Sequence, residues 1–292
     1  MSSSEETSIS QPERLRILFL LTRQAIGQAL SAFGIPAGSR GLDAGCGAGC
    51  HLELLGRRVG PSGGVIAFDL SFENLVEAEA AYRRGSFGSE TLGPAQPRKP
   101  GPGKERPEID FVLGDICMLP FAAGAFDWVW CADTLWGGTA EEGPAAVVAE
   151  FARVTRPRGK VALTYWSSQT LLPGYPMLEA RLNEAFVRST SYLAGIAPEH
   201  QHLKALDWLR AAGLKRRRAK TFVAEVRAPF SRETREAIAV CFDMFWGDLQ
   251  GEISTAEWQE YRRLCAPDSP DFIADRSGYY GFITYTMFWG VR

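Results

Sequence analysis

The amino-acid sequence predicts an α/β fold: a doubly wound, mostly parallel sheet of seven strands, covered by helices on both faces. Three observations support this. Short apolar segments of strand type alternate with segments of helical period between residues 39 and 166. Four glycines crowd the stretch GLDAGCGAG, residues 41–49, between the first such strand and the next helix. The 292 residues are 46% hydrophobic and 23% charged, which is typical of a globular chain with a large core.

The elements of the core follow in a regular order after a polar N-terminal tail, 1–10, which we expect to be disordered. An amphipathic helix over 15–34 carries Arg16 and Arg23, so it is too interrupted to span a membrane. Ser71 is the expected N-cap of a later helix. The strands are expected at 39–44, 65–70, 109–115, 126–133 and 159–166, and the helices between them at 50–59, 71–84 and 145–156.

Insertions are expected to divide the rest of the chain. Residues 83–107 hold five glycines and five prolines, which predicts a flexible surface insertion within a core of residues 11–166. A helical cap is expected at 167–202, then a core helix at 203–214 and a sixth strand at 219–230, approached by the solvated basic run 215–218. A helical insertion, 231–280, precedes the seventh strand at 281–292.

The glycine turn fits two common nucleotide-binding patterns poorly. A dinucleotide fold needs glycines in the order G-x-G-x-x-G, but Gly45, Gly47 and Gly49 are spaced by two and Cys50 follows. A phosphate loop needs Lys followed by Ser or Thr, and the helix here begins Cys50-His51-Leu52. Some other ligand must account for the exposed main chain.

The order D-x-G-x-G-x-G at 43–49 resembles motif I of the class I S-adenosylmethionine-dependent methyltransferases. The rest of the core is similar to that family as well. VIAFD places Asp69 at the end of the second strand, and Gly114-Asp115-Ile116 follows the third. FDWVWCADTL matches the pattern around the fourth strand, and FARVTRPRGKVALTY matches the helix and strand after it. The resemblance covers residues 39–166 and is nearest to the small-molecule group, methyltransferase type 11-like, which includes quinone-type enzymes; it implies a Rossmann-like methyltransferase fold.

S-adenosyl-L-methionine is the cofactor that this resemblance implies, with roles that suit the residue types. The glycines allow its methionine portion to lie against main chain. Asp43 is expected to fix the ammonium, Asp69 to accept from the ribose hydroxyls and Asp115 to accept from the adenine amino group, with turn stabilisation or helix capping as the structural alternatives. The expected cofactor-binding residues are Asp43, Gly45, Cys46, Gly47, Gly49, Asp69, Leu70, Asp115, Ile116, Cys131 and Ala132.

Candidate catalytic and acceptor-binding residues are expected at the carboxyl ends of the strands, where open parallel sheets bind ligands. Asp133 is a candidate base or an anchor for the cofactor's amine, and His200, of the pair His200 and His202, is a second candidate base. A purely structural role remains the alternative for each. Trp136, which could shield the sulfonium, Tyr165, Trp166 and Tyr175 are the expected acceptor-binding residues, with core packing as the alternative for Trp136.

The net charge and the cysteine content limit the possible partners and the cellular compartment. A formal net charge of −2 argues against a nucleic-acid surface, which would need a strongly basic face. Six scattered cysteines indicate free thiols in a reducing compartment, so we expect a cytoplasmic protein. Cys46 and Cys50 are the only close pair, and no metal site is expected. The oligomeric state stays open.

The expected function is methyl transfer from S-adenosylmethionine to a small, hydrophobic or aromatic acceptor by in-line displacement. Positioning of the reactants supplies much of the catalysis in such a reaction. Whether oxygen, nitrogen or carbon accepts the methyl group stays open. Two alternatives remain: a non-catalytic S-adenosylmethionine-binding or regulatory module, and an NAD-dependent oxidoreductase.

Overall fold

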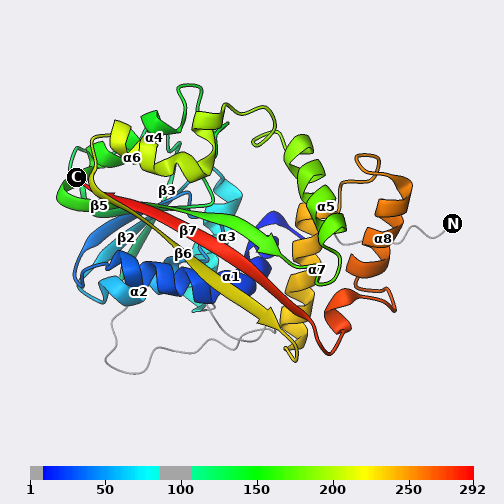
Figure 1. Ribbon diagram of the computed structural model, residues 1–292. Helices are drawn as coiled ribbons and strands as arrows, with labels where there is room; N and C mark the ends of the chain where they lie inside the picture. Colours follow the sequence, from blue (N-terminus) through cyan, green and yellow to red (C-terminus); the bar gives the residue numbers. More distant parts are fainter. Residues whose placement is uncertain (1–8, 86–106) are drawn as a thin grey trace.

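The computed structural model describes residues 9–85 and 107–292 and arranges their strands in a single seven-stranded sheet (Figure 1). The strand order is β3-β2-β1-β4-β5-β7-β6, and β7 alone runs antiparallel to its neighbours. This confirms the predicted doubly wound fold. The predicted N-terminal tail falls outside the described residues except for its last two positions, and most of the predicted insertion at 83–107 does too.

The parallel part of the sheet brings the ends of β1, β2 and β4 together. Strand β1 pairs with β2 on one side and with β4 on the other, so the residues that follow these three strands share one edge. Strands β3 and β5 flank this central group. The bounds are β1 Arg40–Ala44, β2 Gly64–Asp69, β3 Glu108–Leu113, β4 Phe126–Ala132 and β5 Thr155–Thr170.

Helices cover both faces of the sheet, and each face has its own buried apolar cluster (Figure 1). Helices α1 Gln11–Phe33, α2 Leu52–Val59 and α3 Phe72–Arg84 pack on one face, and α4 Pro144–Val154 and α6 Ala205–Ala211 on the other. Ser71 caps α3 as predicted, because its hydroxyl accepts the amide of Asn74 at 3.2 Å.

The long strands β5, β6 Lys215–Arg227 and β7 Tyr280–Val291 extend beyond the central sheet towards three further helices (Figure 1). We refer to α5 Pro176–Ser189, α7 Arg232–Trp246 and α8 Thr255–Cys265 as the distal helices. The indole of Trp246 is fully buried, stacks on Phe242 and donates to Asn183 of α5 at 3.1 Å. Arg14 of α1 pairs with Asp243 of α7, which ties the distal helices to the core.

Several element boundaries differ from those predicted, and three of them have a clear physical reason. Strand β5 begins at Thr155 and ends at Thr170, so the first residues of the predicted cap at 167–202 continue the sheet by pairing with β7. Strand β6 begins at Lys215, because the basic run 215–218 lies on an edge strand where charged side chains face solvent. Helix α6 is shorter than the predicted 203–214 because a 3₁₀ turn, His202–Lys204, precedes it.

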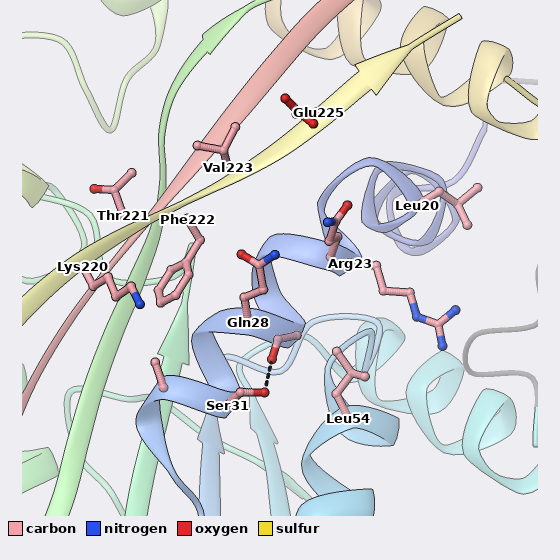
Figure 2. Close-up of a pocket in the computed structure, with 13 residues that line it drawn as sticks. Leu20, Arg23, Gln28, Ser31, Leu54, Lys220, Thr221, Phe222, Val223 and Glu225 are labelled. Carbon is pink, nitrogen blue, oxygen red and sulfur yellow. Dashed lines mark hydrogen bonds between the residues drawn. The ribbon is translucent and has the colours of Figure 1, made fainter. Parts of the chain in front are cut away.

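A broad open groove of about 1250 Å³ runs along the outside of the molecule between α1 and the edge strand β6 (Figure 2). Arg23 and Gln28 of α1 face Lys220, Phe222 and Glu225 of β6 across it. None of the predicted site residues is among the described residues that line this groove. Across 9–85 and 107–292, the helices include none with the length and apolar character needed to cross a membrane.

Candidate functional site

The glycine turn after β1 adopts a conformation that favours glycine. Gly45, Gly47 and Gly49 have φ angles of 80°, 53° and 77°. The amides of Gly45 and Cys46 both donate to the carbonyl of Phe68, at 2.7 and 3.0 Å. The turn is therefore fastened to β2, the strand that carries Asp69 at its end.

Asp69 lies directly against the glycine turn. Its Oδ2 accepts the amide of Gly47 at 2.8 Å, while Oδ1 accepts the amide of Ser71 at 2.9 Å and the side-chain amide of Asn74 at 3.4 Å. A carboxylate has about four lone-pair positions, so Oδ2 keeps capacity for a further donor. The two features on which the predicted cofactor site depends are thus in contact.

Asp43 is a buried carboxyl group with an unsatisfied oxygen. It is 1% exposed, and its Oδ2 has no hydrogen-bond partner within the described part of the chain. Burial, together with the nearby charge of Asp69, raises the pKa of Asp43 to about 8. A ligand cation at this oxygen would supply both the missing donor and the compensating charge.

The residues predicted to bind adenine directly follow β2 and β3. Leu70 is 72% exposed and Ile116 is 6% exposed, so one presents an apolar surface and the other belongs to the core. Asp115 is exposed, and its Oδ1 accepts the amide of Cys117 at 2.8 Å. Its other oxygen suits a ligand amino group.

Thr134 links the end of β4 to the glycine turn, and sequence reasoning missed it. Its hydroxyl lies 2.9 Å from the carbonyl of Ala132 and 3.1 Å from that of Gly45. Cys131 and Ala132, both predicted at the cofactor, are buried beside it. A Cβ added at Gly45 would come within 2.2 Å of Thr134, so only glycine fits there. The only available signal was its place directly after a core strand.

Leu15 covers the turn from the other side. Its Cδ1 would lie 3.3 Å from a Cβ at Gly47, so the first turns of α1 stand over the glycines. Nothing in the pattern of the first helix pointed to this contact, because it joins segments that are about thirty residues apart through tertiary packing.

Asp133 is held from two sides at the end of β4. Its Oδ1 accepts the amide of Trp166 and its Oδ2 accepts the hydroxyl of Tyr285, each at 2.7 Å. Its φ of 49° is unusual for a non-glycine residue and marks a strained position. Burial raises the pKa of Asp133 to about 6, although both hydrogen bonds act in the opposite direction.

Aromatic side chains stand on both sides of Asp133. The ring of Trp136 lies 5.4 Å from that of Tyr165 and 5.8 Å from that of Tyr192. On the other side, the ring of Trp166 lies 5.0 Å from Phe245 of α7. Tyr165 is 1% exposed and its hydroxyl donates to the carbonyl of Leu135, so it supports Trp136 from within the core.

The two predicted histidines occupy different environments. The His200 ring covers Gly143 at the start of α4, where its Nε2 would lie 2.6 Å from an added Cβ. His202, rather than its neighbour, packs on Trp136 with ring centres 5.2 Å apart. Burial lowers the pKa of His202 to about 4, so its ring is neutral at physiological pH.

Tyr175 belongs to a separate cluster near the distal helices. Its hydroxyl lies 3.4 Å from a guanidinium nitrogen of Arg263 in α8 and 3.2 Å from one of Arg276. The Arg276 side chain also lies over the Tyr175 ring. The contacts of Tyr175 therefore connect α5 to the predicted insertion at 231–280, whereas the other three predicted acceptor-binding residues surround Asp133.

No cluster of three or more His, Cys, Asp or Glu suited to a metal ion occurs among the residues described. All six cysteines are free. Desolvation raises the pKa of the thiol of Cys46, which is buried, and that of Cys50, which is half-buried, so both thiols are protonated.

Comparison with known proteins agrees with this geometry. A family model described as a methyltransferase domain matches residues 42–163, which run from β1 into β5. An uncharacterized 37.1 kDa protein in transposon TN4556 of Streptomyces fradiae is 35% identical over 161 residues, 54% of this chain and 39% of that protein. Nocamycin O-methyltransferase of Saccharothrix syringae is 30% identical over 200 residues, 64% of this chain and 63% of that one. The chain thus spans less than two thirds of the length of these relatives.

A solved structure shares the fold over nearly the whole chain. Geranyl diphosphate C-methyltransferase from Streptomyces coelicolor A3(2), in complex with S-adenosyl-L-homocysteine, superposes with a TM-score of 0.50 at 14% identity, covering 98% of this chain and 82% of that one. The matched domain, the strand order and the turn held by Asp69 agree on one assignment. Residues 42–163 thus match the methyltransferase domain family, and nearly the whole chain shares the fold of a solved methyltransferase.

Proposed function

We propose that the protein binds S-adenosylmethionine across the glycine turn and Asp69 and transfers its methyl group to a small, hydrophobic or aromatic acceptor. The observation that carries the proposal is the 2.8 Å hydrogen bond between Asp69 and Gly47. It joins a bare main-chain turn and a carboxylate at one strand edge, where a nucleoside bearing an amino-acid tail can contact both.

Each part of the cofactor has a candidate partner. The buried, unpartnered Oδ2 of Asp43 suits the ammonium, and the remaining capacity of Asp69 suits a ribose hydroxyl. Asp115 suits the adenine edge, and the exposed side chain of Leu70 suits its face. When bound, the cofactor supplies a methyl group already activated by its sulfonium. The chain's own task is then to orient the acceptor and exclude water, which accounts for about 7 to 11 kcal/mol in well-aligned reactions.

The acceptor is proposed to bind beside Asp133, between the Trp136 and Trp166 sides. Aromatic walls favour a flat or apolar molecule, because contact with them removes its apolar surface from water. The name of the nocamycin relative supports a small-molecule acceptor. We propose that the distal helices, with the 167–202 segment, cap this region. The free thiols favour a reducing compartment such as the cytoplasm.

Calorimetric titration with S-adenosylhomocysteine tests the cofactor site. Asp69→Ala removes the acceptor for a ribose hydroxyl, and one charge-assisted hydrogen bond corresponds to at least about a tenfold loss of affinity. Asp268→Ala, a change at an exposed carboxylate near the end of α8, is the matched control and should bind normally. Equal affinity in the two variants would remove the basis of the assignment, and tight binding of NAD instead would favour an oxidoreductase.

Turnover is a separate question from binding. Incubating the protein and methyl-labelled S-adenosylmethionine with a bacterial metabolite extract should transfer label to a small organic product. An extract that stays unlabelled while S-adenosylhomocysteine binds would favour a non-catalytic cofactor-binding module.

A further inference from the structure

The carboxylate of Asp133 has a hydrogen-bond partner that is distant in the sequence. Tyr285 lies in β7, 152 residues away, and its hydroxyl donates a hydrogen bond to Oδ2 of Asp133 at 2.7 Å. The side chain of Thr22 in α1 hydrogen-bonds the same tyrosine. The contact therefore joins the antiparallel strand, the first helix and the loop after β4 at a single carboxylate.

The register of the sheet keeps this contact in place. Tyr285 pairs with Trp166 of β5, whose amide donates to the other oxygen of Asp133. Both donors of the carboxylate thus come from one paired position across two strands. Since β7 also pairs with β6, it cannot slip without breaking two ladders.

The titratable groups that face Asp133 within the described residues are all neutral acids. They are Cys131 in β4, Tyr165 in β5, Tyr192 in the segment after α5 and Tyr285 in β7. Burial raises the pKa of each, so each keeps its proton near neutral pH. Asp133 itself, with a pKa of about 6, therefore differs from these four groups in that its charge changes near neutral pH.

We propose that Tyr285 is a positioning residue that holds Asp133 ready to take a proton from a hydroxyl group of the acceptor, which is therefore an aromatic or enolic alcohol methylated on oxygen. This inference rests on the proposed function. Each carboxylate oxygen uses one lone pair for its present donor, so a second lone pair is available to an acceptor hydroxyl.

The transfer balances without any further reagent. The acceptor's O–H bond breaks and its proton passes to a carboxylate oxygen of Asp133. The freed electron pair on oxygen forms the new bond to the methyl carbon, and the pair of the carbon–sulfur bond stays on sulfur. The products are the methyl ether, S-adenosylhomocysteine and protonated Asp133, which releases its proton to water.

A hydroxyl acceptor suits these surroundings better than an ammonium or a carbon nucleophile. Trp136, Tyr192, Trp166 and Phe245 present aromatic surface, and transfer of a charged ammonium into such a space costs more than transfer of a neutral alcohol. An unsaturated carbon nucleophile carries no acidic proton before methyl transfer, so it would not use the carboxylate to form the nucleophile. A neutral alcohol with an acidic O–H bond uses both the walls and the carboxylate.

Carbon-13 NMR titration of aspartate-labelled protein, saturated with S-adenosylhomocysteine, tests the positioning role without turnover. Asp133→Asn identifies the resonance. Tyr285→Phe removes a hydrogen bond to the charged form, so the midpoint of Asp133 should rise by about one pH unit. Tyr279→Phe, which removes another buried hydroxyl bonded to a main-chain carbonyl, is the matched control and should leave the midpoint unchanged.

A gentler substitution covers the case in which Tyr285→Phe does not fold. A 3-fluorotyrosine at position 285 keeps the packing and makes the hydroxyl a stronger donor, so the midpoint of Asp133 should fall. An unchanged midpoint in whichever variant folds would overturn the positioning role.

The chemical class of the acceptor is tested with the labelled product of the extract experiment. A methyl group on oxygen, a rate that falls at least about 100-fold in Asp133→Asn, and an acid limb of kcat/KM that rises with the NMR midpoint are expected. A methyl group on nitrogen or carbon, or an unaffected rate in Asp133→Asn, would refute this inference and leave the proposed function intact. If the unmodified protein does not bind S-adenosylhomocysteine, the proposed function itself is refuted.

Discussion

Asp43 should make the stability of the protein fall as pH rises. The group is buried and its pKa is raised from 3.8 to about 8, so the folded state favours the neutral carboxyl. The unfolded chain ionises near pH 4, which means that the stabilisation is fully present below that pH and is lost by about pH 8. A difference of about four pH units corresponds to about 6 kcal/mol.

Asp43→Asn removes this ionisation and keeps the shape of the side chain. The free energy of unfolding, from urea titrations between pH 4 and 9, should fall less steeply in the variant than in the unmodified protein. The difference between the two curves isolates Asp43 from Asp133, whose raised pKa acts in the same direction. Since natural domains have only about 5 to 15 kcal/mol of stability, the effect should be easily measured.

Cofactor binding should lower the cost of ionising Asp43. The ammonium of S-adenosylhomocysteine favours the charged carboxylate, so binding at pH 7 should release a proton from Asp43. Calorimetry in phosphate and in Tris, which differ in ionisation enthalpy, measures that release, and the Asn variant should show none from this site. Parallel stability curves for the two proteins, with equal proton release, would refute the reasoning.

Three further substitutions test the turn, the distal helices and a buried base. Gly45→Ala, with a φ of 80° and a Cβ 2.2 Å from Thr134, should weaken S-adenosylhomocysteine binding at least about tenfold in calorimetry, whereas Gly174→Ala, strained but unobstructed, should not. Trp246→Ala should lower the free energy of unfolding by about 3 to 5 kcal/mol in urea; a change below about 1 kcal/mol would contradict its burial. Burial lowers the pKa of His51 to about 4, so its stabilisation is present above pH 6.5 and about 3 kcal/mol is lost towards pH 4; His51→Gln should remove that loss, as acid titration followed by circular dichroism would detect.

Local patterns predicted the positions of Asp69 and the glycine turn relative to each other. Glycine spacing and strand ends are short-range features, so Asp69 and the turn at Gly45–Gly49 could be placed on one edge before any coordinates were available. The Ser71 cap is of the same kind. Where a residue's neighbours lie within one strand–turn–helix unit, sequence alone is informative.

The proposed acceptor site depends on contacts between distant segments. Tyr285 meets Asp133 across 152 residues, and no local period marks it as different from other aromatic residues of β7. His200 ends one 3₁₀ turn and His202 begins the next, so their two-residue spacing does not determine the relative direction of the two rings. Tyr175 was grouped with Trp166 by proximity in sequence, but the continuation of β5 to Thr170 carries the chain away before Tyr175.

The position of β7 between β5 and β6 has a consequence for how such chains diversify. Its alignment is specified twice, once by each neighbour, so the connection that leads into it contributes little to that alignment. About fifty residues, including α7 and α8, fill this connection here. We therefore expect that a chimera in which this connection is exchanged between relatives methylates a different acceptor but keeps its affinity for S-adenosylhomocysteine.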